Sequence, residues 1–165
     1  MKLIVSFVLL NWVASYALAN CRNGWITYDE WCCLFSHNQL TWSEASETCH
    51  ALHAHLATVM SAEEQNFLST QLLELHKNDP KLSSTLYWLD GSDLEVEHVW
   101  KWMTTGDILT FTDWAPNEPN MGENEDCLIL WGASKFQMGD NACAHKRNYI
   151  CQQTVDVDTG NEFIG

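Results

Sequence analysis

Side-chain oxygens are concentrated between Trp114 and Cys143, and this segment is where the chain could do chemistry. It reads Trp-Ala-Pro-Asn-Glu-Pro-Asn-Met-Gly-Glu-Asn-Glu-Asp-Cys, then an apolar run, then Met-Gly-Asp-Asn-Ala-Cys. No Lys or Arg interrupts the stretch from Asn117 to Asp126, so its carboxylates repel one another unless water or a cation neutralises them. Calcium suits this set because it takes ~6–8 oxygen ligands from carboxylates, amide carbonyls and water. A solvated acidic turn without metal is the alternative.

A metal site here must be assembled from separated parts of the chain, because no contiguous Asp-x-Asp-x-Asp-Gly calcium loop is present. Catalysis by these carboxylates is not expected. A glycosidase needs one acid in an apolar setting and a second left ionised, whereas here all are crowded in one polar loop. Neither Gly-x-Ser-x-Gly nor His-Glu-x-x-His occurs, so we predict that the chain is not an enzyme.

Two amphipathic helices are predicted upstream of this segment. Thr41-Trp-Ser-Glu44 is a capping-box sequence, and the apolar face that follows it extends to about Ala54. A second start at Ser61 has Glu three residues later, and Asn78-Asp-Pro80 stops that helix. The expected buried faces are Trp42, Ala45, Cys49 and Leu52 in the first helix and Leu68, Leu72 and Leu75 in the second.

Short strands are predicted in the rest of the chain, so the expected fold class is α+β. A hairpin is expected between Asn20 and Phe35, and four aromatic or β-branched runs lie beyond Leu82. Trp100 and Trp102 alternate on one strand face; we expect them in the core, with stacking on sugar rings as the alternative. The four runs are residues 86–89, 99–102, 127–131 and 149–152.

Length and charge limit the classes of protein. The chain has 165 residues, which suits one domain, and a formal net charge of −14. That charge disfavours nucleic acid and anionic membranes as partners, because both require basic patches. Cations and neutral polar molecules are the expected partners.

The ends of the chain are predicted to lie outside the folded domain. Residues 1–19 have the features of a secretory signal, with Lys2, an apolar run and Ala-Leu-Ala before Asn20. We therefore predict cleavage after Ala19 and a secreted, extracellular protein without a membrane anchor. The domain is expected to cover residues 20–153, and residues 154–165 are expected to be an acidic flexible tail.

Seven cysteines follow the signal, and export makes disulfides their expected use. Six cysteines can pair in 15 ways, so their spacing leaves the connectivity open, and one cysteine must remain unpaired. No repeated Cys-x-x-Cys pair suggests a zinc cage.

Taken together, the order and spacing of these motifs resemble a single C-type lectin-like domain covering nearly all of the exported chain. The resemblance implies the disulfides Cys21–Cys32, Cys49–Cys151 and Cys127–Cys143. The motifs that carry it are Cys21 with Gly24-Trp25 and Cys32, Trp42-x-x-Ala45-x-x-x-Cys49, Ala54-His-Leu-Ala57, Trp88-Leu-Asp-Gly91, Trp114 before Glu118-Pro-Asn120, Glu125-Asp-Cys127, Asp140-x-x-Cys143 and Tyr149-Ile-Cys151.

By this resemblance, the Glu118-Pro-Asn120 motif binds sugar through Ca²⁺, with Pro119 reached through a cis bond. Glu118 accepts and Asn120 donates a hydrogen bond to a sugar hydroxyl, the pattern for mannose, glucose, N-acetylglucosamine or fucose. The implied metal ligands are Glu118, Asn120, Glu125 and Asp140, and the implied carbohydrate-binding residues are Glu118, Asn120 and Glu125. Glu123 is a second candidate for the place of Glu125.

The chain departs from the family pattern at Gly139, where relatives commonly have Asn before the last Asp. The missing side chain removes one calcium oxygen and one amide donor to sugar, so we expect weak calcium affinity of ~10⁻⁴ to 10⁻³ M. An auxiliary calcium site occurs in many relatives, and Asp93, Glu95 and Glu97 are the residues that could form it here.

Two further features have competing interpretations. Cys33 is the unpaired cysteine, on an expected outer strand; it could form an intermolecular disulfide and a homodimer, or be buried and inert. Dimerisation would raise avidity by ~10²–10⁴. His50, His53 and His55 resemble a metal-binding tract, but structural roles are the expected ones.

The predicted function is a secreted, calcium-dependent lectin that recognises mannose-type glycans on cell or microbial surfaces, with innate defence as the role that the resemblance implies. The alternative is a lectin-like domain whose sugar binding is weakened at Gly139 and which engages a protein partner.

Overall fold

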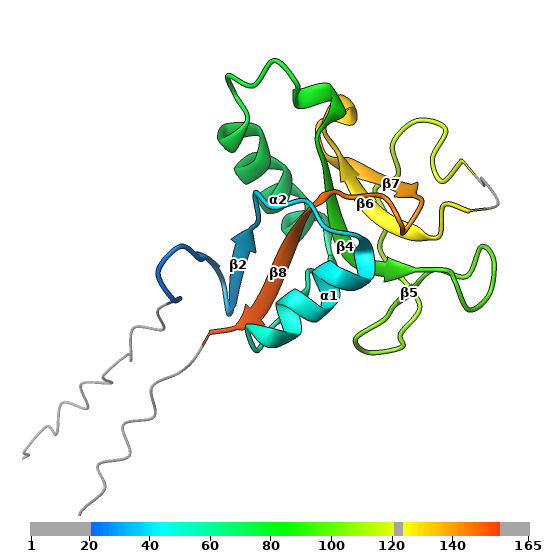
Figure 1. Cartoon of the computed structure of the whole chain (residues 1–165), viewed down its shortest axis with the longest axis horizontal. Coiled ribbons are helices and arrows are strands. Elements are labelled where there is room, and N and C mark those ends of the chain that lie inside the picture. Colours follow the sequence, from blue (N-terminus) through cyan, green and yellow to red (C-terminus); the bar gives the residue numbers. More distant parts are fainter. Residues whose placement is uncertain (1–20, 121–123, 156–165) are drawn as a thin grey trace, which may run out of the picture.

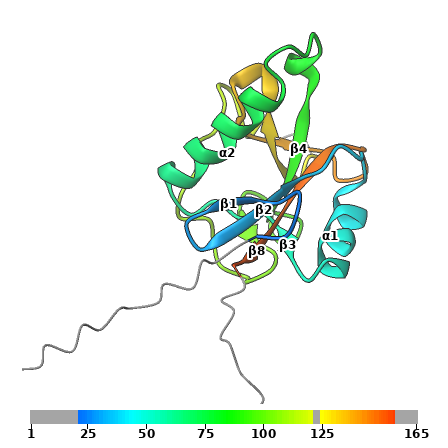
Figure 2. The same cartoon turned by 90° about the vertical axis from the view of Figure 1, so that its left-hand side faces the viewer.

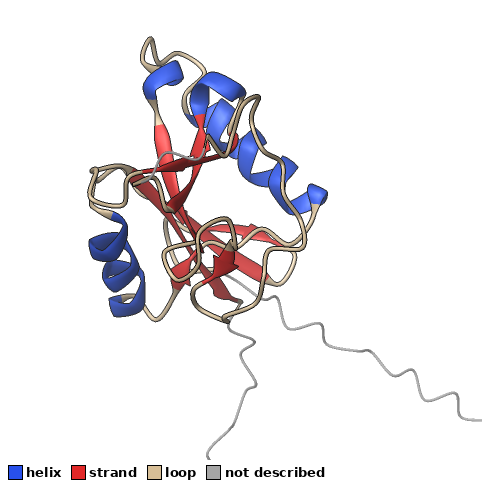
Figure 3. Cartoon of the chain, turned by 90° about the vertical axis from the view of Figure 1, so that its right-hand side faces the viewer, coloured by secondary structure: helices blue, strands red, loops and turns tan. Residues whose placement is uncertain are grey.

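The computed structural model describes residues 21–120 and 124–155. Two helices lie on opposite sides of a set of short strands (Figures 2 and 3). The helices are α1 (Trp42–Ala51) and α2 (Ala62–Leu75), with 3₁₀ turns η1 (Leu82–Ser84) and η2 (Gly132–Ser134). The strands are β1 (Ile26–Tyr28), β2 (Trp31–Phe35), β3 (His55–Leu56), β4 (Leu86–Ser92), β5 (Lys101–Trp102), β6 (Cys127–Trp131), β7 (Gln137–Asn141) and β8 (Asn148–Thr154).

The last strand, β8, joins the early and late parts of the chain (Figure 1). The sheet order is β1-β2-β8-β4-β6-β7, with β3 paired to β8 and β5 to β4. All the pairs are antiparallel except β4 with β8. The predicted α+β fold is therefore confirmed, with β6 and β7 at the end of the sheet remote from β1.

Helix α1 begins as its sequence predicts. The Thr41 hydroxyl accepts from the Glu44 amide, and the Glu44 carboxylate accepts from the Thr41 amide, which completes the capping box. Ala45 and Cys49 are buried, and Trp42 and Leu52 pack against the same apolar cluster.

Helix α2 differs from its prediction in two details. The Ser61 hydroxyl accepts from the Glu64 amide, but the Glu64 carboxylate accepts from Met60 rather than from Ser61. The prediction for Leu75 is wrong, because this side chain is 46% exposed. The helix ends at Leu75, and the next residue, His76, makes the inward contact through its Nε2 and the Tyr87 hydroxyl at 2.9 Å.

The predicted runs each contain a strand, but the run 99–102 is shortened to β5 (Lys101–Trp102), and the last strand is longer than expected. Strand β8 runs through Thr154, and the Val155 amide donates to the Glu30 carbonyl at 2.8 Å. Thr154 and Val155 therefore belong to the domain, and the tail expected from residue 154 would begin at residue 156. The rest of the tail, like the predicted signal at 1–19, lies outside the described residues.

The core consists of two apolar clusters. One contains Trp100 and Trp102, which are only 8% and 1% exposed, so their predicted core role is confirmed. Trp100 packs edge-on against Trp114 at 5.3 Å between ring centroids. The second cluster surrounds the Cys49–Cys151 disulfide and contains Trp88. Trp114 thus connects the core to the acidic segment that follows it.

Three disulfides join the pairs that the family resemblance implies: Cys21–Cys32, Cys49–Cys151 and Cys127–Cys143. The second bridge ties α1 to β8 across 102 residues of sequence. Closing so long a loop restricts the unfolded chain, which chain-entropy models value at ~4.7 kcal/mol. The third bridge joins the start of β6 to the segment after β7.

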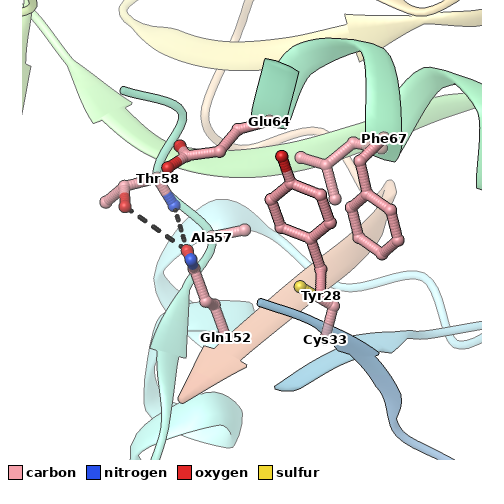
Figure 4. A pocket seen from close by; sticks show the side chains of 8 residues that line it. Tyr28, Cys33, Ala57, Thr58, Glu64, Phe67 and Gln152 are labelled. Carbon is pink, nitrogen blue, oxygen red and sulfur yellow. Dashed lines mark hydrogen bonds between the residues drawn. The ribbon is translucent and has the colours of Figure 1, made fainter. Parts of the chain in front are cut away.

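Cys33 is the free cysteine, and its expected place on an outer strand is wrong. Strand β2 lies between β1 and β8 rather than at the sheet edge, and the Cys33 side chain is 3% exposed in the core. Figure 4 shows its sulfur close to the Tyr28 side chain, whose ring stacks on that of Phe67 with 4.3 Å between the centroids. Beside it, Gln152 Oε1 accepts from the Thr58 amide and hydroxyl. The alternative of a buried thiol is the one that the structure supports.

Cys33 is expected to resist alkylation in the folded protein. Burial, with a smaller contribution from Glu64, raises the pKa of the thiol to about 12, so little reactive thiolate exists at pH 8. We expect labelling by iodoacetamide to be at least ~100-fold slower than in denaturant, where one thiol per chain should react. Mass spectrometry of timed aliquots measures the rate; fast native labelling would contradict the burial.

No helix in the described part of the chain has the length and apolar character needed to span a bilayer.

Candidate functional site

Strand β7 brings the second half of the acidic segment to the first. It pairs with β6 so that Asp140 lies opposite Leu128 and Gly139 opposite Ile129. This strand has no clear signal in the sequence, because Gln-Met-Gly-Asp-Asn has no β-branched residue and no clear alternation. The Cys127–Cys143 disulfide then holds the start of β6 close to the end of β7.

Backbone hydrogen bonds fix the Glu118 loop on β7. The Ala115 amide donates to the Met138 carbonyl at 2.7 Å, and the Met138 amide donates to the Asp113 carbonyl at 2.8 Å. The Glu118 amide donates to the Ala115 carbonyl at 2.9 Å, and the Glu118–Pro119 bond is cis, as the family resemblance implies. Glu118 is therefore held beside Gly139 and Asp140.

The four predicted metal ligands lie together. Glu118, Asn120, Glu125 and Asp140 line one cleft of about 250 Å³. The backbone amide of Asn120 donates to Asp140 Oδ1 at 3.2 Å. The side-chain Nδ2 of Asn141 donates to Glu125 Oε1 at 3.5 Å. The apolar part of the wall comes from Leu86, Ile129 and Trp131.

Glu123 and Asn141 are near the four predicted ligands in the sequence. Glu123, the second candidate for the place of Glu125, lies outside the described residues. Asn141 was not among the predicted site residues, although it contacts Glu125 and lines the cleft. Its position directly after Asp140 could have indicated a role in the site. The direction of its side-chain amide, however, depends on the path of strand β7.

Glu118 carries the most strongly perturbed carboxyl of this cleft. Among the described residues, Glu118 Oε2 is buried and has no hydrogen-bond partner. Burial first, and the adjacent Asp140 carboxyl second, raise the pKa of Glu118 to about 7. A buried carboxylate oxygen without a donor, next to a second carboxylate, is an arrangement that a hard cation would stabilise.

Calcium binding at this cleft is expected to depend on pH. Glu118 must lose its proton before it can bind a metal, and its pKa of about 7 lies above its ordinary value. Apparent affinity should therefore fall as pH falls, becoming about tenfold weaker at pH 6 than at pH 8. Isothermal titration with CaCl₂ at the two values measures this; equal affinities would show that the Glu118 carboxyl is already ionised at pH 6.

Gly139 faces the cleft. A Cβ built on it would lie 3.4 Å from Glu118 Cγ and 3.4 Å from Ile129 Cδ1. These are close contacts without overlap, so a side chain at position 139 would enter the space beside Glu118. The family resemblance predicts that a ligand group is missing at position 139, and this geometry leaves room for such a side chain beside Glu118.

A second acidic group lies in the loop after β4. Asp93, Glu97 and His98 place one ligand atom each within 4.8 Å of the others. Glu95, the third residue predicted for an auxiliary site, is not in this group, because its Oε2 binds Lys101 Nζ at 2.7 Å. Burial and the charges of Asp126 and Asp140 raise the pKa of Asp93, so this loop belongs to the same electronegative region.

The histidine tract does not form a metal site as it stands. His50, His53 and His55 line one cleft of about 400 Å³, but in the described chain their ring nitrogens do not come within ligand distance of one another as a group. His55 Nδ1 lies 2.7 Å from the Leu56 carbonyl, a local structural contact. This agrees with the expected structural role for His55, whereas His50 and His53 are exposed.

Comparison with known proteins decides the family. A model described as the lectin C-type domain matches residues 38–153. The chain belongs to the C-type lectin family. This C-type lectin domain is 27% identical to a perlucin-like protein of Mytilus galloprovincialis, over 82% of this chain and 84% of the relative. It is 33% identical to C-type lectin domain family 6 member A of Mus musculus, over 80% of this chain and 60% of the relative.

Solved structures show the same fold. The cow C-type carbohydrate-recognition domain of CD23, determined in the presence of a GlcNAc2Man3 oligosaccharide, superposes with a TM-score of 0.68. Its sequence is 26% identical, and the match covers 82% of this chain and 96% of that one. The predicted C-type lectin fold is thereby confirmed.

Proposed function

We propose that this C-type lectin is a secreted protein that binds mannose-type glycans through a Ca²⁺ ion held by Glu118, Asn120, Glu125 and Asp140. The observation that carries the proposal is the convergence of these four oxygen-bearing side chains in one cleft, with a buried oxygen on Glu118 that has no hydrogen-bond partner in the described part of the chain. Carboxylate and amide oxygens are the donor set that calcium prefers.

The residues around the ion would define how sugar is recognised. Glu118 and Glu125 are acceptors for sugar hydroxyl protons, and the Asn120 amide is a donor. Asp140 Oδ1 accepts a hydrogen bond from the Asn120 backbone amide, which holds Asn120 in position next to Glu118. Bound calcium would supply direct coordination of a pair of neighbouring sugar hydroxyls.

Mannose-type sugar is supported by two observations. The loop keeps the order acceptor, Pro, donor in Glu118-Pro119-Asn120, which the family resemblance associates with mannose, glucose, N-acetylglucosamine and fucose. The fold neighbour from cow was determined with a mannose-containing oligosaccharide. Glycan recognition in innate defence is the biological role that fits such a protein, by analogy with the family.

Export is supported by the signal-like residues 1–19 and by three disulfides in the domain. Disulfides persist in oxidising compartments and are rare in the cytosol. We propose that the secreted chain starts at Asn20.

The proposal predicts retention on mannose resin in calcium and elution by a chelator. The chelator removes the ion, which returns the cleft to a set of repelling carboxylates. Retention that persists in EDTA would contradict the proposal. So would a lack of retention at ~10 mM calcium, a concentration above the weak end of extracellular affinities.

A second candidate, a lectin-like domain that engages a protein, is favoured by one observation. Gly139 supplies no side chain to the cleft, so the sugar-binding set is one group short. A glycan array probed with and without calcium separates the two functions, because a protein-binding domain should show no calcium-dependent glycan signal.

A further inference from the structure

We propose that Asn141 is a further carbohydrate-binding residue, whose side-chain amide donates a hydrogen bond to a sugar hydroxyl beside Glu125. Arg147 is the positioning residue that directs this amide into the cleft. Asn141 is the last residue of β7, and Arg147 directly precedes β8. This inference rests on the proposed function, because it concerns the same cleft and the same class of glycan.

Hydrogen bonds determine which end of the Asn141 amide faces the cleft. Arg147 Nε donates to Asn141 Oδ1 at 3.2 Å, and His145 Nδ1 lies 3.1 Å from the same oxygen. A guanidinium group has donors and no acceptor, so the atom beside Arg147 must be the oxygen of the amide. The amide nitrogen, Nδ2, therefore points the other way, where it lies 3.5 Å from Glu125 Oε1.

Arg147 is itself held in place. Its backbone exchanges two hydrogen bonds of 2.9 Å with Leu40, and its Nη1 donates to the Lys146 carbonyl at 3.1 Å. The side chain is half-buried, so it cannot move as freely as one on the surface. The direction of the Asn141 amide is thus fixed before a ligand binds, which lowers the entropy cost of using it.

The Asn141 amide nitrogen has donor capacity to spare. It carries two N–H groups, and among the described residues its one hydrogen bond is the contact with Glu125. At 3.5 Å this contact is longer than an ordinary N–H···O bond of ~2.7–3.2 Å. Both residues are partly exposed and line the same cleft of about 250 Å³, so a hydroxyl in the cleft can reach both side chains.

A sugar hydroxyl bound to a metal ion still needs one acceptor and one donor. Its oxygen gives one lone pair to the ion, its second lone pair accepts a hydrogen bond, and its hydrogen is donated. In the proposed site Glu118 and Asn120 are such a pair, and Glu125 is the acceptor for the neighbouring hydroxyl. The family resemblance places the second donor at position 139, where this chain has glycine. Asn141, two residues further along β7, supplies that donor instead.

Replacing Asn141 by Ala tests the assignment. We expect mannose binding to weaken about five- to tenfold, because one donor is lost, and calcium affinity to stay within about twofold, because no predicted metal ligand is removed. Isothermal titration measures both, first with CaCl₂ and then with methyl α-mannoside at ~10 mM calcium. Asn66→Ala removes an exposed amide of α2 outside the cleft and should change neither affinity.

Gly139→Asn supplies a rescue that a merely structural role of Asn141 would not allow. The introduced amide returns a donor to the position implied by the family. In the Gly139→Asn background, Asn141→Ala should therefore weaken mannose binding less than about twofold. In the ¹⁵N-labelled parent, the side-chain amide resonances of Asn141 should shift when mannose is added in calcium.

Two variants of Arg147 test its positioning role. Arg147→Met removes the donor to Asn141 Oδ1, so the amide can turn, and mannose binding should weaken about threefold. Arg147→Lys keeps a donor and should restore the parent affinity. Calcium affinity should stay within about twofold in both variants, since neither removes a predicted ligand.

Unchanged mannose affinity in Asn141→Ala would overturn the inference. Equal losses of calcium and mannose affinity would do the same, because they indicate that Asn141 only supports the fold of the cleft. Without calcium-dependent mannose binding by the parent, the proposed function and this inference fail together. Parent binding with an unaltered Asn141→Ala overturns this inference alone.

Discussion

Replacing Gly139 by Asn is expected to tighten calcium binding about tenfold, from a Kd of ~1 mM toward ~0.1 mM. The new amide oxygen would enter the space beside Glu118, where a Cβ added at position 139 would lie 3.4 Å from Glu118 Cγ without overlap. Gly139 lies in regular β7 and does not require a left-handed backbone, so the substitution should cost little conformational strain. The added amide would also donate to sugar, so retention on mannose resin should increase in parallel.

Gly139→Ala is the matched control for this variant. It adds the same Cβ contact with Glu118 but no ligand atom, so its calcium affinity should stay within about twofold of the parent. Isothermal titration with CaCl₂ measures both variants. If Asn and Ala give the same affinity, position 139 does not face the ion and the site must be assembled differently.

Replacing Asp140 by Asn is expected to abolish calcium binding while stabilising the calcium-free protein. The variant keeps the shape and the acceptor for the Asn120 amide but removes one of the negative charges that hold the ion. We expect at least ~100-fold weaker calcium binding, because charge count sets affinity in such sites. In the absence of calcium, Asp140 is 6% exposed and repels Glu118, so removing its charge should raise Tm by a few degrees, on the order of 1 kcal/mol.

Thermal unfolding with and without ~10 mM CaCl₂ measures both effects. At a Kd of ~1 mM the parent should gain ~1.4 kcal/mol, or roughly 5 °C, and Asp140→Asn should gain nothing. Asp107→Asn, an exposed carboxylate outside the cleft, controls for the change in net charge and should keep the calcium response. A calcium-dependent rise in Tm for Asp140→Asn equal to that of the parent would remove Asp140 from the site.

The local signals in the sequence predicted local structure well. The capping box at Thr41 and Glu44 and the serine cap at Ser61 mark the starts of both helices. These signals are reliable because capping involves atoms only three or four residues apart. Leu75 shows where periodicity fails: it continues the apolar spacing, but the helix ends there and the side chain is exposed.

The family pattern supplied the disulfides and the four candidate ligands, which spacing could not have given. Six cysteines allow 15 pairings, and no local rule joins Glu118 to Asp140 across 22 residues. What the pattern missed are the consequences of individual neighbours. Glu95 forms an ion pair with Lys101 and is not part of the second acidic group. Asn141 contacts Glu125 in the cleft.

The sequence by itself determined the fold class, the helix starts and the acidic, amide-rich composition of the candidate site. Only the tertiary structure decided that Cys33 is buried, that Gly139 lies beside Glu118, and that a buried oxygen of Glu118 has no donor among the described residues. The physical reason is that helix caps depend on contacts between residues three or four positions apart, which the sequence shows directly. Burial and convergence depend on which distant strands pair and in what register, here β2 with β8 and β6 with β7.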